Sequence, residues 1–76
     1  MIVGNGIYEI EVSWQDKDEA IKVVMDAEKS GKCKLGDIES FNRDGMRVTT
    51  IYLEDCEFSS WLEIERIMKE DGIRVV

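Results

Sequence analysis

The sequence predicts an α+β fold, a two-layer βαββαβ sandwich with a four-stranded antiparallel sheet and two helices on one face. Three observations support this prediction. Asp44-Gly45 separates two strand-like segments, which is the strongest short-range signal for a β-hairpin. A segment of alternating apolar and polar residues and a segment of helical periodicity precede the hairpin. A second helical segment and a short apolar segment follow it.

Length and charge limit the architecture and the classes of partner. The 76 residues predict a single compact domain over residues 1–76. Seventeen acidic residues against ten basic ones give a net charge of −7. This balance disfavours direct binding to nucleic acid, including RNA, and to anionic membranes, because both need Lys and Arg. It fits a basic protein partner, or solubility alone. We expect a cytoplasmic protein, because the start of the chain lacks the pattern of a signal peptide.

The first strand is predicted over residues 7–14. Side chains alternate between the two faces of a strand. Glu9 and Glu11 should therefore point into water, and the helices should cover the other face, which carries Tyr8, Ile10, Val12 and Trp14. In the preceding segment, Ile2 and Val3 either extend this strand or fray.

The first helix is predicted to begin near Lys17. Asp16 and Glu19 have the spacing of a capping box, in an acidic version. The helix should end at Ser30-Gly31, where the glycine can take the left-handed conformation of a C-cap.

The hairpin from Asp37 to Leu53 is the centre of the predicted fold. A two-residue turn places Arg43 opposite Met46, Phe41 opposite Val48, Glu39 opposite Thr50 and Ile38 opposite Ile51. One face then carries Phe41, Met46, Val48 and Tyr52, and the other carries Ile38, Ile51 and Leu53, with Ser40, Arg47 and Thr49 between them. Both faces are partly apolar, so either both are covered or one of them contacts a partner. A bulge, or a four-residue loop over residues 42–45, is the alternative, and it shifts the register by one pair. Gly36 marks a bulge or the entry of the strand.

The second helix and a final strand complete the predicted order. Ser60 and Glu63 have capping-box spacing, with Asp55 and Ser59 as alternative starts. Asp71-Gly72 should end the helix, and residues 73–76 are predicted to form a short edge strand beside the first strand. This order is the ferredoxin-like arrangement, which leaves one face of the sheet open.

The chain offers little for catalysis. It contains no His, and the acidic residues at 54, 55 and 57 lack the spacing of a calcium loop. Cys33 lies between two lysines, a weak sign of an activated thiol. We expect Cys33 and Cys56 to be reduced, with a disulfide between them as the alternative. The sequence therefore predicts no enzyme, metal site or cofactor.

The remaining features indicate a small acidic protein-interaction module. One version of this hypothesis is an inhibitor or regulator, of the kind carried by mobile elements, that occludes a basic nucleic-acid-handling protein. A homodimer is a second version. The predicted contact residues are Glu9, Glu11, Phe41, Arg47, Val48, Tyr52 and Glu54. The alternative is a small-molecule-sensing regulatory domain that binds a metabolite at a homodimer interface; this rests on analogy of topology.

Overall fold

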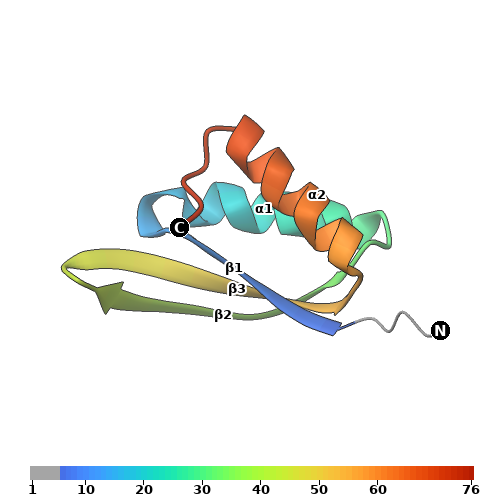
Figure 1. Cartoon of the computed structure of the whole chain (residues 1–76), viewed down its shortest axis with the longest axis horizontal. Coiled ribbons are helices and arrows are strands. Elements are labelled where there is room, and N and C mark those ends of the chain that lie inside the picture. The colour runs from blue at the N-terminus through green and yellow to red at the C-terminus, as the bar shows by residue number, and fades with distance from the viewer. Residues whose placement is uncertain (1–5) are drawn as a thin grey trace.

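The computed structural model describes residues 6–76, so the expectation for Ile2 and Val3 lies outside the described residues. The elements in chain order are β1 (Gly6–Ser13), a 3-10 turn η1 (Trp14–Asp16), α1 (Lys17–Lys29), β2 (Lys34–Arg43), β3 (Met46–Cys56) and α2 (Phe58–Glu70). The strands form one antiparallel sheet in the order β1-β3-β2. Both helices lie on the same side of this sheet (Figure 1). The fold is therefore α+β, with βαββα order.

The predicted four-stranded, ferredoxin-like sheet is wrong, because the described residues form three strands. The C-terminal segment lies beside β1, where the fourth strand was expected, but it makes one isolated bridge between Val12 and Val75. The Ser13 N–H donates to the Arg74 carbonyl (3.0 Å), and the Val76 N–H donates to the Glu11 carbonyl (2.8 Å). These two bonds are too few to extend the sheet, so β3 is its central strand.

The predicted hairpin register is confirmed. Arg43 pairs with Met46 and Phe41 pairs with Val48, and the turn residues Asp44 and Gly45 have φ values of 51° and 80°. Positive φ at both central residues is the signature of the type I′ turn, whose twist matches that of the flanking strands. The alternative of a shifted register at the turn is wrong. A bulge does occur, but between Leu35 and Ile38, where Gly36 had marked it.

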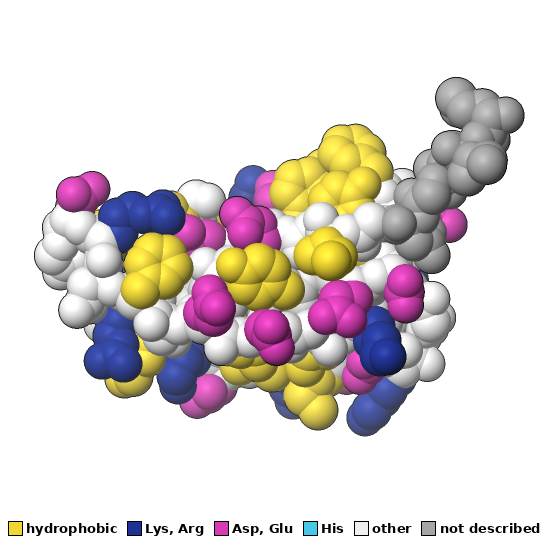
Figure 2. Space-filling model, turned by 90° about the horizontal axis from the view of Figure 1, so that it is seen from below, with side chains coloured by type: hydrophobic (Ala, Val, Ile, Leu, Met, Phe, Trp, Pro, Cys, Tyr) yellow, Lys and Arg dark blue, Asp and Glu magenta, His cyan; other side chains and the backbone are white. Residues whose placement is uncertain are grey.

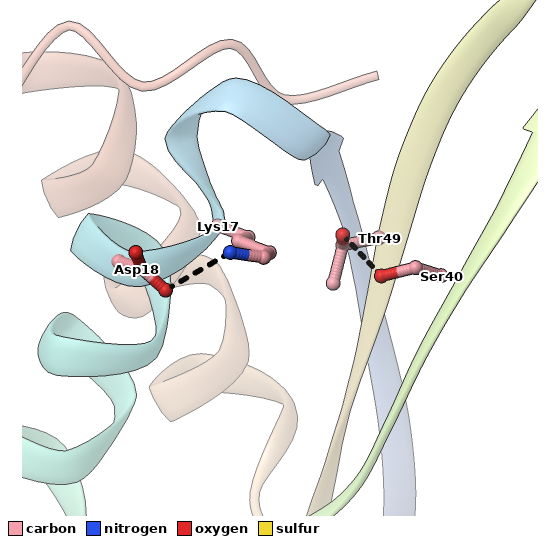
Figure 3. Close-up of polar contacts among 4 residues, drawn as sticks. All are labelled: Lys17, Asp18, Ser40 and Thr49. Carbon is pink, nitrogen blue, oxygen red and sulfur yellow. Dashed lines mark hydrogen bonds and ion pairs between the residues drawn. The ribbon is translucent and has the colours of Figure 1, made fainter.

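The core lies between the sheet and the two helices. Its centre is β3, where Ile51 and Leu53 are fully buried. The strand β1 adds Ile10 and Val12, and the helices add Ala20, Val24, Ile64 and Met68. Thr49 is also buried on this side, and its hydroxyl hydrogen-bonds with that of Ser40 (2.9 Å), so that burial leaves no polar atom unpaired (Figure 3).

Both helices end in the same way. At the end of α1 the Lys32 N–H donates to the Ala27 carbonyl (3.0 Å), and Gly31 has φ 77°. At the end of α2 the Ile73 N–H donates to the Met68 carbonyl (2.9 Å), after Gly72 with φ 80°. This six-to-one bond after a left-handed glycine is the Schellman motif, and both predicted C-terminal ends are confirmed.

Asp16 is the N-cap residue of α1, which begins at Lys17 as predicted, but neither of the predicted capping boxes forms. The Asp16 side chain makes no cap bond, and its Oδ2 instead accepts the backbone N–H of Arg74 (3.1 Å). In the first turn of α1, Lys17 Nζ lies 3.2 Å from Asp18 Oδ1 (Figure 3). The helix α2 begins at Phe58, with Glu57 at the N-cap, so the Ser60 capping box does not form.

Two aromatic residues on β1 and next to it have different surroundings. Tyr8 stacks on Trp61 of α2, with ring centroids 5.5 Å apart. The indole Nε1 of Trp61 donates to the Glu9 carbonyl (3.1 Å), which fixes α2 against β1. Trp14 was expected in the core, but β1 ends at Ser13 and the chain turns into η1 there. The Trp14 side chain is consequently 38% exposed.

Candidate functional site

The candidate site is the open face of the sheet, the face that the helices leave uncovered. Alternation along β1 and β2 places Ile7, Glu9 and Glu11 on this face, together with Glu39, Phe41 and Arg43. The central strand contributes Val48, Thr50, Tyr52 and Glu54. Figure 2 shows this face: separate hydrophobic patches alternate with acidic side chains across its middle. Charged side chains surround each of these apolar patches, and an apolar centre with a charged rim is the arrangement found in interaction surfaces.

Tyr52 lies at the centre of the acidic side chains. It pairs directly with Glu9 across β1 and β3, and its hydroxyl donates a long hydrogen bond to Glu39 Oε2 (3.4 Å). The pKa of Tyr52 is raised, first by the charge of Glu39, then by partial desolvation and by the charges of Glu9 and Asp37. Three carboxylates around one phenol create a negative potential that favours a cation.

An ion pair crosses the open face. The guanidinium of Arg43 on β2 donates from both terminal nitrogens to the carboxylate of Glu11 on β1, with Nη2 to Oε2 at 2.8 Å. Because β3 lies between these strands, the pair passes over the central strand. Val48 and Thr50 on that strand are 2% and 4% exposed, although the helices do not cover them. The ion pair therefore closes part of this face to a partner.

The seven predicted contact residues do not form a single surface. Glu9, Phe41, Tyr52 and Glu54 lie together on the open face, and Phe41 is 38% exposed. Glu11 is on the same face but is engaged by Arg43.

The other two predicted residues, Val48 and Arg47, are placed differently. Val48 is buried, as described above. Arg47 points to the helix side, with its Cζ 5.0 Å from the centre of the Trp14 ring. Lys17 Nζ lies 4.9 Å from the same ring, so Arg47 belongs to a cation–π cluster at the end of the molecule.

The sequence reasoning missed three residues of the open face. Glu39 and Asp37 surround Tyr52, and Ile7 is 72% exposed. The signal for Glu39 was present, because it lies two residues from Phe41 on the same strand and so shares its face. No comparable signal existed for Asp37, because the bulge breaks the alternation there.

The bulge also shapes the surface at Glu54. A Cβ atom on Gly36 would lie 2.8 Å from Glu54 Oε2 and 3.1 Å from the Tyr52 carbonyl. The absence of a side chain at Gly36 therefore lets the Glu54 carboxylate lie close against β2, next to Tyr52.

The two cysteines are free, buried and adjacent to each other, and no disulfide forms. Burial raises the pKa of Cys33 to about 11, with further contributions from Cys56 and Glu28. Lys32, which had suggested an activated thiol, is paired with Glu63 instead (2.5 Å). At neutral pH the Cys33 side chain is thus a protonated thiol, which is a poor nucleophile.

The surface has shallow hollows rather than a deep pocket. One of about 230 Å³ lies between the helices and is lined by residues such as Val23, Asp26 and Ile64. Another of about 380 Å³ lies beside β1 and includes Glu9, Glu11 and Trp61. Residues 6–76 contain no group of three or more His, Cys, Asp or Glu side chains placed to hold a metal ion. Within the same range, no helix is long and apolar enough to cross a membrane.

Comparison of the chain with protein-family models, curated proteins and solved structures found no match.

Proposed function

We propose that this protein is an acidic protein-interaction module that docks a basic partner on the open face of its sheet. The observation that carries the proposal is the group of carboxylates around Tyr52 on a face that no helix covers. Glu9, Glu39 and Asp37 supply the charge. Phe41 and Ile7 supply exposed apolar area.

The chemistry of this face favours an arginine or a lysine side chain from the partner. A cation can lie over the ring of Tyr52 and bind the neighbouring carboxylates at the same time. A different side chain of the partner can pack against Phe41, which pairs with Val48, four residues from Tyr52 along β3. Five carboxylates (Asp37 and Glu9, 11, 39 and 54) against Arg43 and Lys34, which pairs with Glu54, give this face a net charge of −3.

The partner class proposed here is a basic protein that handles nucleic acid. Such a protein carries lysines and arginines to contact phosphates, and an acidic surface competes for them. In this role the module acts as an inhibitor or regulator by occlusion. Electrostatic attraction would mainly raise the rate of association, while the buried apolar contacts would slow dissociation.

The proposal is tested by competition. A panel of purified basic DNA-binding domains is loaded with fluorescent duplex DNA, and displacement of the duplex by the full chain is followed by anisotropy across a salt series. We expect displacement from at least one domain, weakening steeply with salt because exposed charges are screened.

A matched pair of variants locates the surface. Glu9→Lys/Asp37→Lys reverses two of the carboxylates around Tyr52, and Asp18→Lys/Glu19→Lys makes the same charge change on α1. The first variant should lose displacement and the second should retain it. Equal behaviour of the two variants, or no displacement from any domain in the panel, rejects the proposed function.

A further inference from the structure

The outer edge of β2 is the longest unpaired strand edge in the described residues. β2 pairs only with β3, and every residue from Asp37 to Arg43 is exposed. At the start of β2 the Leu35 N–H donates to the Glu28 carboxylate of α1 (3.0 Å), whereas from Ile38 to Arg43 no described strand other than β3 pairs with β2. An edge of this kind presents a row of free N–H and C=O groups to another strand.

The hairpin geometry determines which backbone groups point outward. In a two-residue hairpin the residues that flank the turn, here Arg43 and Met46, exchange both backbone hydrogen bonds. Hydrogen-bonded and non-hydrogen-bonded pairs then alternate along the strands. The backbone groups that point away from β3 are therefore those of Ile38, Ser40 and Asn42.

The features that usually block edge pairing are absent from this half of the strand. The bulge, which would disturb pairing, lies before Ile38. The chain contains no proline. Lys34 and Arg43 balance Asp37 and Glu39, so β2 has two basic and two acidic residues and no net charge, in a chain of −7. Two copies can thus approach along β2 with less repulsion than along the rest of the surface.

We propose that two copies of this chain associate through an antiparallel β2–β2 pairing, with the two-fold axis at Phe41. The outward-pointing backbone groups belong to alternate residues, Ile38, Ser40 and Asn42. These groups face each other in the two copies only when the two-fold axis passes through a residue, not when it passes between two residues. An axis at Glu39 sets two identical carboxylates against each other. An axis at Ser40 leaves Phe41 opposite Glu39, and it requires Asp37, which lies in the bulge, to pair regularly with Arg43.

The axis at Phe41 uses only the regular part of the strand and is complementary in charge. Glu39 of each copy lies opposite Arg43 of the other on the open face, so two cross-strand ion pairs form when each Arg43 guanidinium, which binds Glu11 in the single chain, turns to Glu39 of the other copy. Phe41 faces its own equivalent in a non-hydrogen-bonded pair, where the two side chains come closest. Each Phe41 ring already has its own Arg43 guanidinium 5.2 Å from its centre.

The resulting assembly is a six-stranded sheet whose two open faces are continuous, and it brings the two Phe41 rings into contact on that face. It does not depend on the proposed basic partner, because the pairing uses the strand edge. The paired segment is short, so the dimer is of the weak, transient class.

The experiment is sedimentation equilibrium of the full chain over a wide concentration range. We expect a monomer–dimer equilibrium. Glu39→Arg and Arg43→Glu should each raise the dissociation constant at least tenfold, because each sets like charges opposite each other. An equimolar mixture of these two variants should restore association, since every cross-strand pair is then of opposite charge. Glu19→Arg, an exposed change of the same charge on α1, should leave association unchanged.

Disulfide trapping tests the register independently of charge. Under mild oxidation with glutathione disulfide, Phe41→Cys should give a covalent dimer, whereas Ser40→Cys should not. A chain that stays monomeric at all concentrations, a mixture that does not associate, or preferential trapping through Ser40→Cys overturns the proposal. Circular dichroism of each variant separates loss of pairing from loss of folding. Failure of duplex displacement leaves these results unaffected, so the two proposals fail separately.

Discussion

Replacing Leu53 with alanine should destabilise the fold far more than the same substitution at Leu62. Leu53 is fully buried at the centre of the sheet, where it faces the helices, and Leu62 on α2 is 45% exposed. Leu→Ala in a core costs about 2–5 kcal/mol, because transfer free energy is lost and a cavity remains. A surface substitution of this kind usually changes stability by no more than about 0.5 kcal/mol.

The size of the domain makes this difference decisive. A chain of 76 residues has a total stability of roughly 4–11 kcal/mol. A loss of about 3 kcal/mol lowers the melting temperature of such a domain by roughly 12–24 °C. Leu53→Ala should therefore melt roughly 12–24 °C below the parent chain, while Leu62→Ala should melt within a few degrees of it.

Urea unfolding, followed by circular dichroism and by tryptophan fluorescence, measures both variants. The linear extrapolation gives each free energy of unfolding, and an unchanged slope shows that the denatured state is not altered. If the two variants lose similar stability, or Leu53→Ala loses less than about 1 kcal/mol, the placement of the core between β3 and the helices is refuted.

Three further predictions concern the backbone and the titratable groups. Gly45→Ala should cost about 1–2 kcal/mol in urea unfolding, because φ is +80° and no atom lies near the added Cβ, so the cost is backbone strain alone; Gly6→Ala, where φ is ordinary, should cost less than half as much. The hydrogen bond and the charge of Lys32 hold the pKa of Glu63 below its ordinary value of 4.5. This pair therefore contributes stability above pH 4.5 that is lost as the pH falls through the lowered pKa, and Glu63→Gln should remove that part of the acid dependence; an NMR titration midpoint for Glu63 at or above 4.5 contradicts this. The pKa of Cys33 is raised to about 11, so the stability that the protonated thiol contributes is complete below pH 9 and is lost as the pH rises toward 11. Alkylation of this thiol by iodoacetamide at pH 7.5 should be slow in the native protein and fast in urea. Rapid alkylation in the native protein argues against burial of Cys33.

Local chemistry explains which parts of the fold were predictable. The Asp44-Gly45 turn needs positive φ at two successive residues, and that local requirement predicted the observed register of β2 and β3, with a four-residue loop and a shifted register as the alternative. The C-terminal ends of the helices could be predicted from local sequence in the same way, because a glycine that can take positive φ follows each helix. The prediction of a fourth strand over residues 73–76 was wrong, because a strand-like composition of four residues does not determine how many backbone hydrogen bonds they make with the neighbouring strand.

The errors at the N-caps and in the contact surface were long-range. Asp16 had the right residue type and spacing for a cap, but Arg74, far away in the sequence, takes its carboxylate. Val48 was correctly placed on the face of Phe41. Its burial under an ion pair between β1 and β2 depends on the order of the strands, which the sequence pattern did not specify.

The bond between Asp16 and Arg74 joins residues 58 positions apart, and it is one of few that tie down the last segment of the chain. Formation of this hydrogen bond closes a long loop and brings few other contacts with it. We therefore expect the contact between Asp16 and the C-terminal segment to form late in folding. Because few hydrogen bonds hold residues 73–76, we expect this segment to detach from β1 first as the temperature rises. Amide hydrogens at positions 73–76 should therefore exchange well ahead of those at the centre of β3, and the open state would leave one side of β1 free.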